Sequence, residues 1–223
     1  MPYLRDRAFI LKKEPFREQD RRIVMYGKEH GLLIAVARGA SRSSSKQAGQ
    51  LEPFTEAEVM IAHGRAYDKL AVAQGIPGAT PIATLGGLSV MGTFSDLVAS
   101  LTRPGVSDHH IYDLLRDVRD VCASLPSEPT ADRGRLLYAA ASLKLLDLVG
   151  FAPSADRSSG LEFGPVRALV FMRRAPLADV VRLTMTTDVL DAACAFVEDA
   201  MRHTPLEKAP HGPATIHALL AAH

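Results

Sequence analysis

Arg38, Arg42 and Lys46 stand four residues apart in a stretch that contains no acidic residue and lies between two apolar runs. The stretch is rich in serine and is flanked by glycines. Guanidinium, ammonium and hydroxyl groups all donate hydrogen bonds to phosphate oxygens, and glycine lets a backbone approach them closely. The pattern therefore predicts a loop that binds a polyanion. The competing interpretation is an ordinary solvated hairpin loop.

Positive charge is concentrated in the same N-terminal part of the chain. Residues 1–50 contain 11 Lys and Arg against 5 Asp and Glu, whereas residues 83–223 contain 13 against 16. Such asymmetry is typical of a protein that presents one end to nucleic acid. Single strands are held by cations along the backbone and by aromatic faces under the bases. The expected DNA-binding residues are the loop cations Arg38, Arg42 and Lys46 together with Arg5, Arg7, Lys12, Lys13, Arg21 and Arg22. The aromatic candidates are Phe9, Phe16, Tyr26 and Phe54, most of them expected in the core.

Catalytic and metal-binding patterns are not visible in the sequence. The eight histidines are scattered, and Cys122 and Cys194 belong to no CxxC pair. We predict a binding protein rather than an enzyme, with no cofactor and no metal, in a reducing cytoplasm. An enzyme that uses scattered histidines and a metal ion stays open as a minor alternative.

Hydrophobic periodicity divides the chain into a β part and an α part. Period-2 patterns predict five strands, at 7–13, 23–26, 32–36, 55–62 and 70–73. Helical spacing predicts a helix at 85–101, a second that is capped by Ser107 and runs to Leu125, and a third at 129–149. A fourth is expected at 188–201 and a short fifth at 214–222. The predicted fold class is multi-domain α and β. A five-stranded OB-fold β-barrel at residues 1–80 is followed by an all-α domain at residues 81–223.

Five N-terminal motifs resemble the RecO family of bacterial recombination mediators, and they occur in the family's order. They are RDRAFIL at 5–11, PFREQD at 15–20, EHG at 29–31, VARGA at 36–40 and LEPF at 51–54, and a sixth, GFAP at 150–153, follows a Leu-rich helix. The resemblance implies an OB-fold, a helical C-terminal domain and annealing of complementary single strands without ATP. It also implies help in loading RecA onto strands coated by single-stranded DNA-binding protein, in partnership with RecR. By this resemblance, Arg38, Arg42 and Lys46 are the first residues expected to contact DNA.

The chain departs from many members of that family after Arg157, where they carry a four-cysteine zinc module. Here Ser158, Ser159 and Gly160 lead almost directly to FGP at 163–165, so we predict that no structural zinc is bound. The acidic tail of single-stranded DNA-binding protein could dock in a pocket that combines apolar helix faces with Arg116, Arg119, Arg133 or Arg135. These arginines could equally be ordinary solvated charges.

A second function fits the same residues. An OB-fold adaptor could dock a protein or RNA partner, with the helical domain as its docking surface. Such an adaptor need not accelerate strand annealing.

Overall fold

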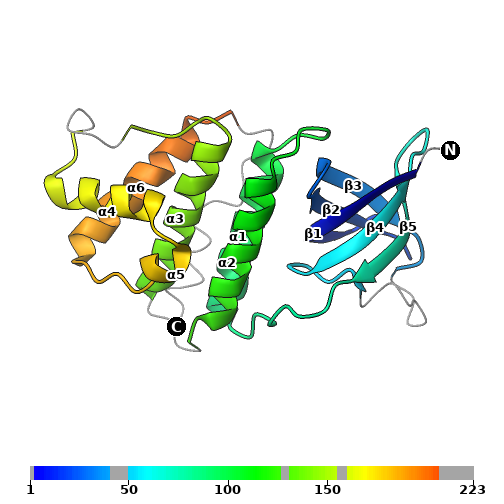
Figure 1. The fold of residues 1–223 in the computed structure, drawn as a ribbon, viewed down its shortest axis with the longest axis horizontal. Coiled ribbons are helices and arrows are strands. Elements are labelled where there is room, and N and C mark those ends of the chain that lie inside the picture. Colours follow the sequence, from blue (N-terminus) through cyan, green and yellow to red (C-terminus); the bar gives the residue numbers. More distant parts are fainter. Residues whose placement is uncertain (1–2, 41–49, 127–130, 155–159, 206–223) are drawn as a thin grey trace. The chain divides into compact units, whose positions relative to one another are not determined.

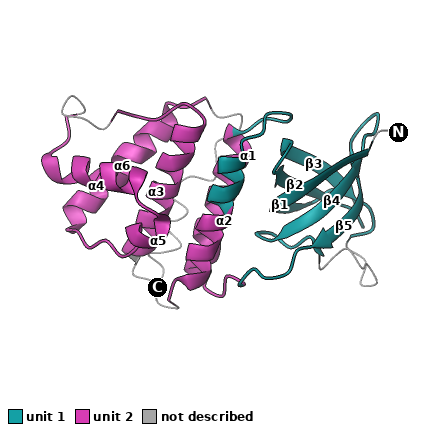
Figure 2. Ribbon diagram, viewed as in Figure 1, with its two compact units in different colours: residues 1–80, 102–115 teal, residues 81–101, 116–223 magenta. Residues whose placement is uncertain are grey.

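The computed structural model describes residues 3–40, 50–126, 131–154 and 160–205. The chain forms two compact units, coloured separately in Figure 2. Unit 1 consists of residues 1–80 and 102–115, and unit 2 of residues 81–101 and 116–223. The domain limits at residue 80, which the sequence suggested, stay a prediction.

Unit 1 is a closed barrel of five strands in the order β1-β2-β3-β5-β4 (Figure 1). The strands are β1 (Tyr3–Pro15), β2 (Arg21–Gly27), β3 (Gly31–Ala37), β4 (Glu56–Ala62) and β5 (Lys69–Gly75). The long strand β1 pairs with β4 through its first half and with β2 through its second, with a register shift between Ile10 and Lys12. A parallel contact between Val36 and Lys69 closes the ring. This arrangement confirms the predicted OB-fold.

Small and branched apolar side chains fill the barrel. In β1 to β4 every second residue points inward, whereas in β5 the core residues Leu70 and Ala73 are three positions apart, beside a register shift with β4. The buried members of the core are Ala8, Ile10, Ile23, Met25, Ala35, Ala37, Ala40, Leu51, Ala57, Val59, Ile61, Leu70 and Ala73.

The β2–β3 turn is held by the buried carboxylate of Asp6. The backbone N–H groups of Glu29 and His30 donate to this carboxylate at 3.2 and 3.0 Å, and His30 Nδ1 lies 3.0 Å from Oδ2. Burial of a carboxylate is tolerated where it accepts several hydrogen bonds. Asp6 of the RDRAFIL motif, in β1, therefore holds the turn that the EHG motif forms.

Residues 102–115 complete unit 1 from outside the strands. Pro104 forms an isolated bridge with Gly31, and the backbone N–H of Asp108 donates to Tyr26 Oη at 3.0 Å. Asp108 Oδ1 in turn accepts the N–H of His110 at 2.8 Å, so it caps helix α2 (His109–Ser124). The predicted Ser107 cap was wrong by one residue, because Asp108 is the side chain that reaches the N–H of the first helical turn.

Unit 2 is helical. Besides the second half of α2 it contains α1 (Leu85–Leu101), α3 (Ala131–Leu148), α4 (Phe163–Arg174), α5 (Leu177–Val180) and α6 (Thr187–Arg202). Helix α3 packs against α1, α4, α5 and α6. No helix was predicted from the sequence where α4 lies, and the helix expected at 214–222 falls outside the described residues. Among the helices of the described part, none is long and apolar enough to cross a membrane.

Candidate nucleic-acid interface

Three connections meet at one end of the barrel. They are the β1–β2 loop at 16–20, the β4–β5 loop at 63–68 and the first residues after β3, at 38–40. Asp20 Oδ1 accepts the N–H of Gly39 at 2.9 Å, which joins the first loop to the last. The N–H of Val36 donates to the carbonyl of Asp68 at 2.8 Å, which joins β3 to the β4–β5 loop. These bonds give the loop end a defined shape.

Exposed cations collect on these loops and at the start of β5. Arg17, Arg38, Arg65 and Lys69 are all exposed, and within the described ranges none of them forms an ion pair with a carboxylate. Two of the nearby acids are engaged elsewhere, since Asp20 accepts the Gly39 N–H and Asp68 lies 3.1 Å from His63. Unpaired cations held at fixed positions are what a phosphate backbone requires.

Among the predicted DNA-binding residues that the structure describes, Arg38 is the one that lies in these three connections. Arg42 and Lys46 lie outside the described residues, so their role stays a prediction. Arg5 is exposed in the half of β1 that pairs with β4, opposite Met60.

Several of the strand cations have internal partners. Lys13 pairs with Glu52 at 2.8 Å, and Arg22 lies 3.7 Å from Glu14. Arg21 donates to the Asp20 carbonyl at 3.2 Å, and Lys12 is half-buried with a partner of its own. The contact of these residues with DNA stays a prediction.

Arg7 is engaged in a network inside unit 1. Its Nε and Nη2 atoms donate to Glu56 Oε2 at 3.1 and 2.8 Å, and the hydroxyl of Tyr112 donates to the same oxygen at 2.6 Å. Burial raises the pKa of Tyr112, and the bond to Glu56 raises it further. Because its guanidinium already balances a buried carboxylate, Arg7 has a structural role in this structure.

Sequence reasoning missed Arg17, Arg65, Tyr67 and Lys69. They belong to no basic run, and Tyr67 lies in a segment that the sequence marked only as a break between strands. The signal that could have found them is the predicted fold itself, because OB-folds bind oligonucleotides through their β1–β2 and β4–β5 loops.

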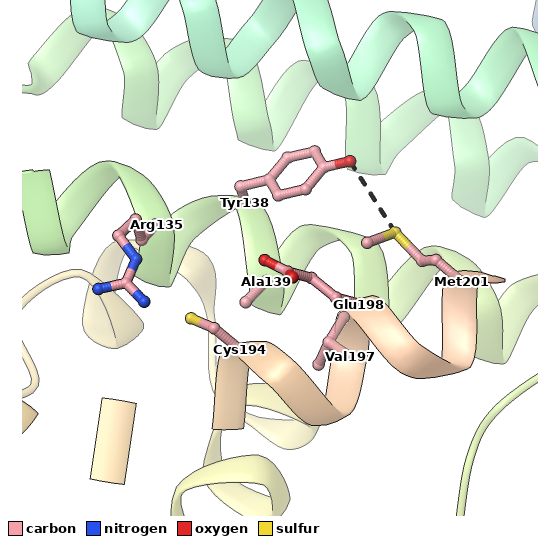
Figure 3. Close-up of a pocket in the computed structure, with 7 residues that line it drawn as sticks. All are labelled: Arg135, Tyr138, Ala139, Cys194, Val197, Glu198 and Met201. Carbon is pink, nitrogen blue, oxygen red and sulfur yellow. Dashed lines mark hydrogen bonds between the residues drawn. The ribbon is translucent and has the colours of Figure 1, made fainter. Parts of the chain in front are cut away.

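A small pocket in unit 2 lies between α3 and α6. Figure 3 shows Arg135, Tyr138 and Ala139 from α3 opposite Cys194, Val197, Glu198 and Met201 from α6. Arg135 is paired with Asp191 at 2.6 Å, and Glu198 brings a carboxylate to the same pocket. The pocket is therefore poorly suited to an acidic peptide, although Arg135 was one of the arginines considered for that purpose.

Asp108, His109 and His110 form the group of potential metal ligands in the described part of the chain. Their ligand atoms lie within 4.8 Å of one another, and both imidazoles are exposed. Asp108 Oδ1 already serves as the cap of α2, so the cluster is accounted for by the helix start.

The two free cysteines are predicted to be unreactive in the native protein. Burial raises the pKa of Cys122 to about 12 and that of Cys194 to about 11. Since the thiolate is the nucleophile, a thiol-reactive disulfide reagent at pH 8 should modify either residue at least ~100-fold more slowly than free cysteine. Both should react at once in denaturant. Rapid modification of one thiol per native chain would contradict the buried positions.

Comparison with known proteins gives a consistent set of matches. Residues 1–78 match the family described as Recombination protein O N terminal. A DNA repair protein RecO from Pelotomaculum thermopropionicum is 28% identical over 153 residues, which cover 68% of this chain and 57% of that protein. The protein of the same name from Bifidobacterium adolescentis is 32% identical over 117 residues, which cover 50% of this chain and 48% of that protein. That from Cutibacterium acnes is 41% identical over 71 residues, covering 32% and 29%. The matched segments thus span between about a third and somewhat over half of these relatives.

Proposed function

We propose that this chain is a DNA repair protein of the RecO family that binds single-stranded DNA and anneals complementary strands. The match of residues 1–78 to the family's N-terminal model and the similarity to several proteins named DNA repair protein RecO support this proposal. In this role it acts as a recombination mediator without catalytic residues. It helps to load RecA onto strands coated by single-stranded DNA-binding protein, with RecR as partner, in the cytoplasm at the nucleoid.

The observation that carries the proposal is the loop end of the barrel, where Arg38, Arg65 and Lys69 are exposed without a carboxylate partner in the described part of the chain. Two single strands repel each other through their phosphates. A protein that neutralises phosphates on both strands lowers this repulsion and brings the bases within pairing distance. Annealing of this kind needs no ATP, because duplex formation itself supplies the free energy.

The test is the rate at which complementary oligonucleotides anneal across a salt series, without ATP or added metal. We expect acceleration that fades as salt rises. If about 3–6 phosphates are contacted, log K for single-strand binding should fall against log salt with a slope of roughly −2 to −4. Clear binding to single strands without acceleration would overturn the annealing activity.

A charge reversal should identify the loop as the contact surface. Arg38→Glu/Arg42→Glu is expected to weaken single-strand binding at least ~10-fold and to flatten the salt slope, because fewer counterions are released. Arg133→Glu/Arg174→Glu in unit 2 changes the net charge equally and should leave binding near that of the native protein. Unchanged binding in the Arg38→Glu/Arg42→Glu protein at low salt would remove the loop from the site.

A protein or RNA adaptor is the second candidate, and the surface of α4 favours it. Phe163 is 71% exposed, and Val170 and Phe171 are each 39% exposed on the same helix. Exposed apolar side chains of this size are typical of a docking surface. Strand annealing separates the two functions, since an adaptor need not accelerate it.

A further inference from the structure

Phe16 and Tyr67 form an aromatic pair on the loop end of the barrel, although they lie in different loops. Their ring centroids are 5.3 Å apart and the ring planes meet at 67°, an edge-to-face arrangement. The guanidinium carbon of Arg17 lies 5.4 Å from the Phe16 centroid and 5.6 Å from that of Tyr67. An aromatic pair and a cation therefore share one small surface.

The loops that carry the pair are anchored on both sides. The N–H of Phe16 donates to the Asp20 carbonyl at 3.3 Å, which closes the β1–β2 loop. In the β4–β5 loop, Asp68 Oδ1 accepts the N–H of Gly64 at 3.2 Å. Anchored loops lose little conformational freedom on binding, so the rings are presented in advance to a ligand.

The pair is not a piece of the barrel core. Phe9 and Tyr26 are fully buried, whereas the residue Phe16 is 38% exposed and Tyr67 is half-buried. Exposed rings beside a guanidinium suit a flat, electron-rich partner that carries negative charge close by. A nucleotide has both properties, because its base offers a π-face and its phosphate accepts from arginine.

We propose that Phe16 and Tyr67 form a stacking site for an unpaired nucleobase and that Arg17 contacts an adjacent phosphate. This inference rests on the proposed function and adds recognition of the base to recognition of charge. Bases within a duplex already stack on their neighbours, so the site selects single strands over duplex DNA. It tolerates any sequence, because every base has a π-face.

The experiment compares two strands with equal numbers of phosphates, oligo-dT and an abasic strand of the same length. Fluorescence anisotropy gives the Kd of each for the full chain and for Phe16→Leu and Tyr67→Leu, which keep apolar volume but remove the aromatic face. We expect the native protein to bind oligo-dT about 10-fold more tightly than the abasic strand. Stacking of one base on an aromatic side chain increases affinity by roughly 5- to 150-fold, so the expected difference falls within that range. Each variant should lose most of this preference and keep the abasic Kd and the salt slope.

The matched control is Phe151→Leu, which removes an aromatic ring that is also exposed, at 46%, but belongs to unit 2 and to none of these loops. This variant should retain the full preference for oligo-dT. Equal binding of both strands by the native protein would overturn the stacking site and leave the charge-based function intact. A preference that survives in both loop variants would also overturn it. Binding of neither strand would end the proposed function and the stacking site together.

Discussion

Replacing Glu56 by alanine is expected to lower the free energy of unfolding by about 3 kcal/mol. The side chain of Glu56 is only 6% exposed, and it accepts from both Arg7 and Tyr112. Its removal leaves the Tyr112 hydroxyl buried without an acceptor, which costs ~1–3 kcal/mol. Loss of one partner of a buried ion pair costs ~3–5 kcal/mol. Because the Arg7 side chain is 40% exposed and solvent screens its charge, we expect a cost at or below the lower end of that range.

The measurement is urea unfolding followed by far-ultraviolet circular dichroism, with Glu58→Ala as the matched control. Glu58 lies two positions along the same strand and is exposed, so its loss should cost less than about 0.5 kcal/mol. Tyr112→Phe should cost about 1 kcal/mol, because Glu56 keeps Arg7. Equal stability of Glu56→Ala and Glu58→Ala would show that the network contributes nothing.

The second large effect is expected for Gly31→Ala, at about 3 kcal/mol or more. Gly31 has a φ of +66°, which costs an alanine ~1–2 kcal/mol. An added Cβ would also lie 2.0 Å from the Val106 carbonyl oxygen, a backbone atom. The segment that bridges to Gly31 through Pro104 would have to move away from the barrel.

Gly105→Ala separates the two causes. Gly105 has a similar φ of +77°, but an added Cβ would meet nothing within 4 Å. This variant should therefore cost only the conformational strain, ~1–2 kcal/mol. If thermal unfolding shows equal losses for the two variants, the contact between Gly31 and residue 106 does not constrain the barrel.

Local pattern was sufficient to predict much of the barrel. The period-2 spacing of core residues, such as Ile23 and Met25 or Ala57, Val59 and Ile61, and the turn residues between the runs follow from the chain within a few residues of each position. These are the features that period-2 spacing reports. The strand count and the OB-fold were predicted for this reason.

Partners distant in the chain were not predictable in this way. Arg7 looks like any other N-terminal cation until Glu56 is placed beside it, 49 positions away. The pairing of Phe16 with Tyr67 likewise depends on closure of the barrel, which brings two loops together. Helix α4 was missed because Gly164 and Pro165 read as a break, although proline is tolerated in the first turn of a helix.

The discontinuity of unit 1 has a consequence for its synthesis. The last strand of the barrel ends at Gly75, but Asp108 and Tyr112, which bond to Tyr26 and Glu56, are translated only after α1. Domains begin to fold while the ribosome is still adding residues. The five strands of the nascent barrel are therefore complete before the Glu56 carboxylate can bond to Tyr112, which becomes possible only when residues 102–115 have left the exit tunnel. A protein fragment that ends at residue 80 would contain all five strands but lack the bonds from Asp108 and Tyr112.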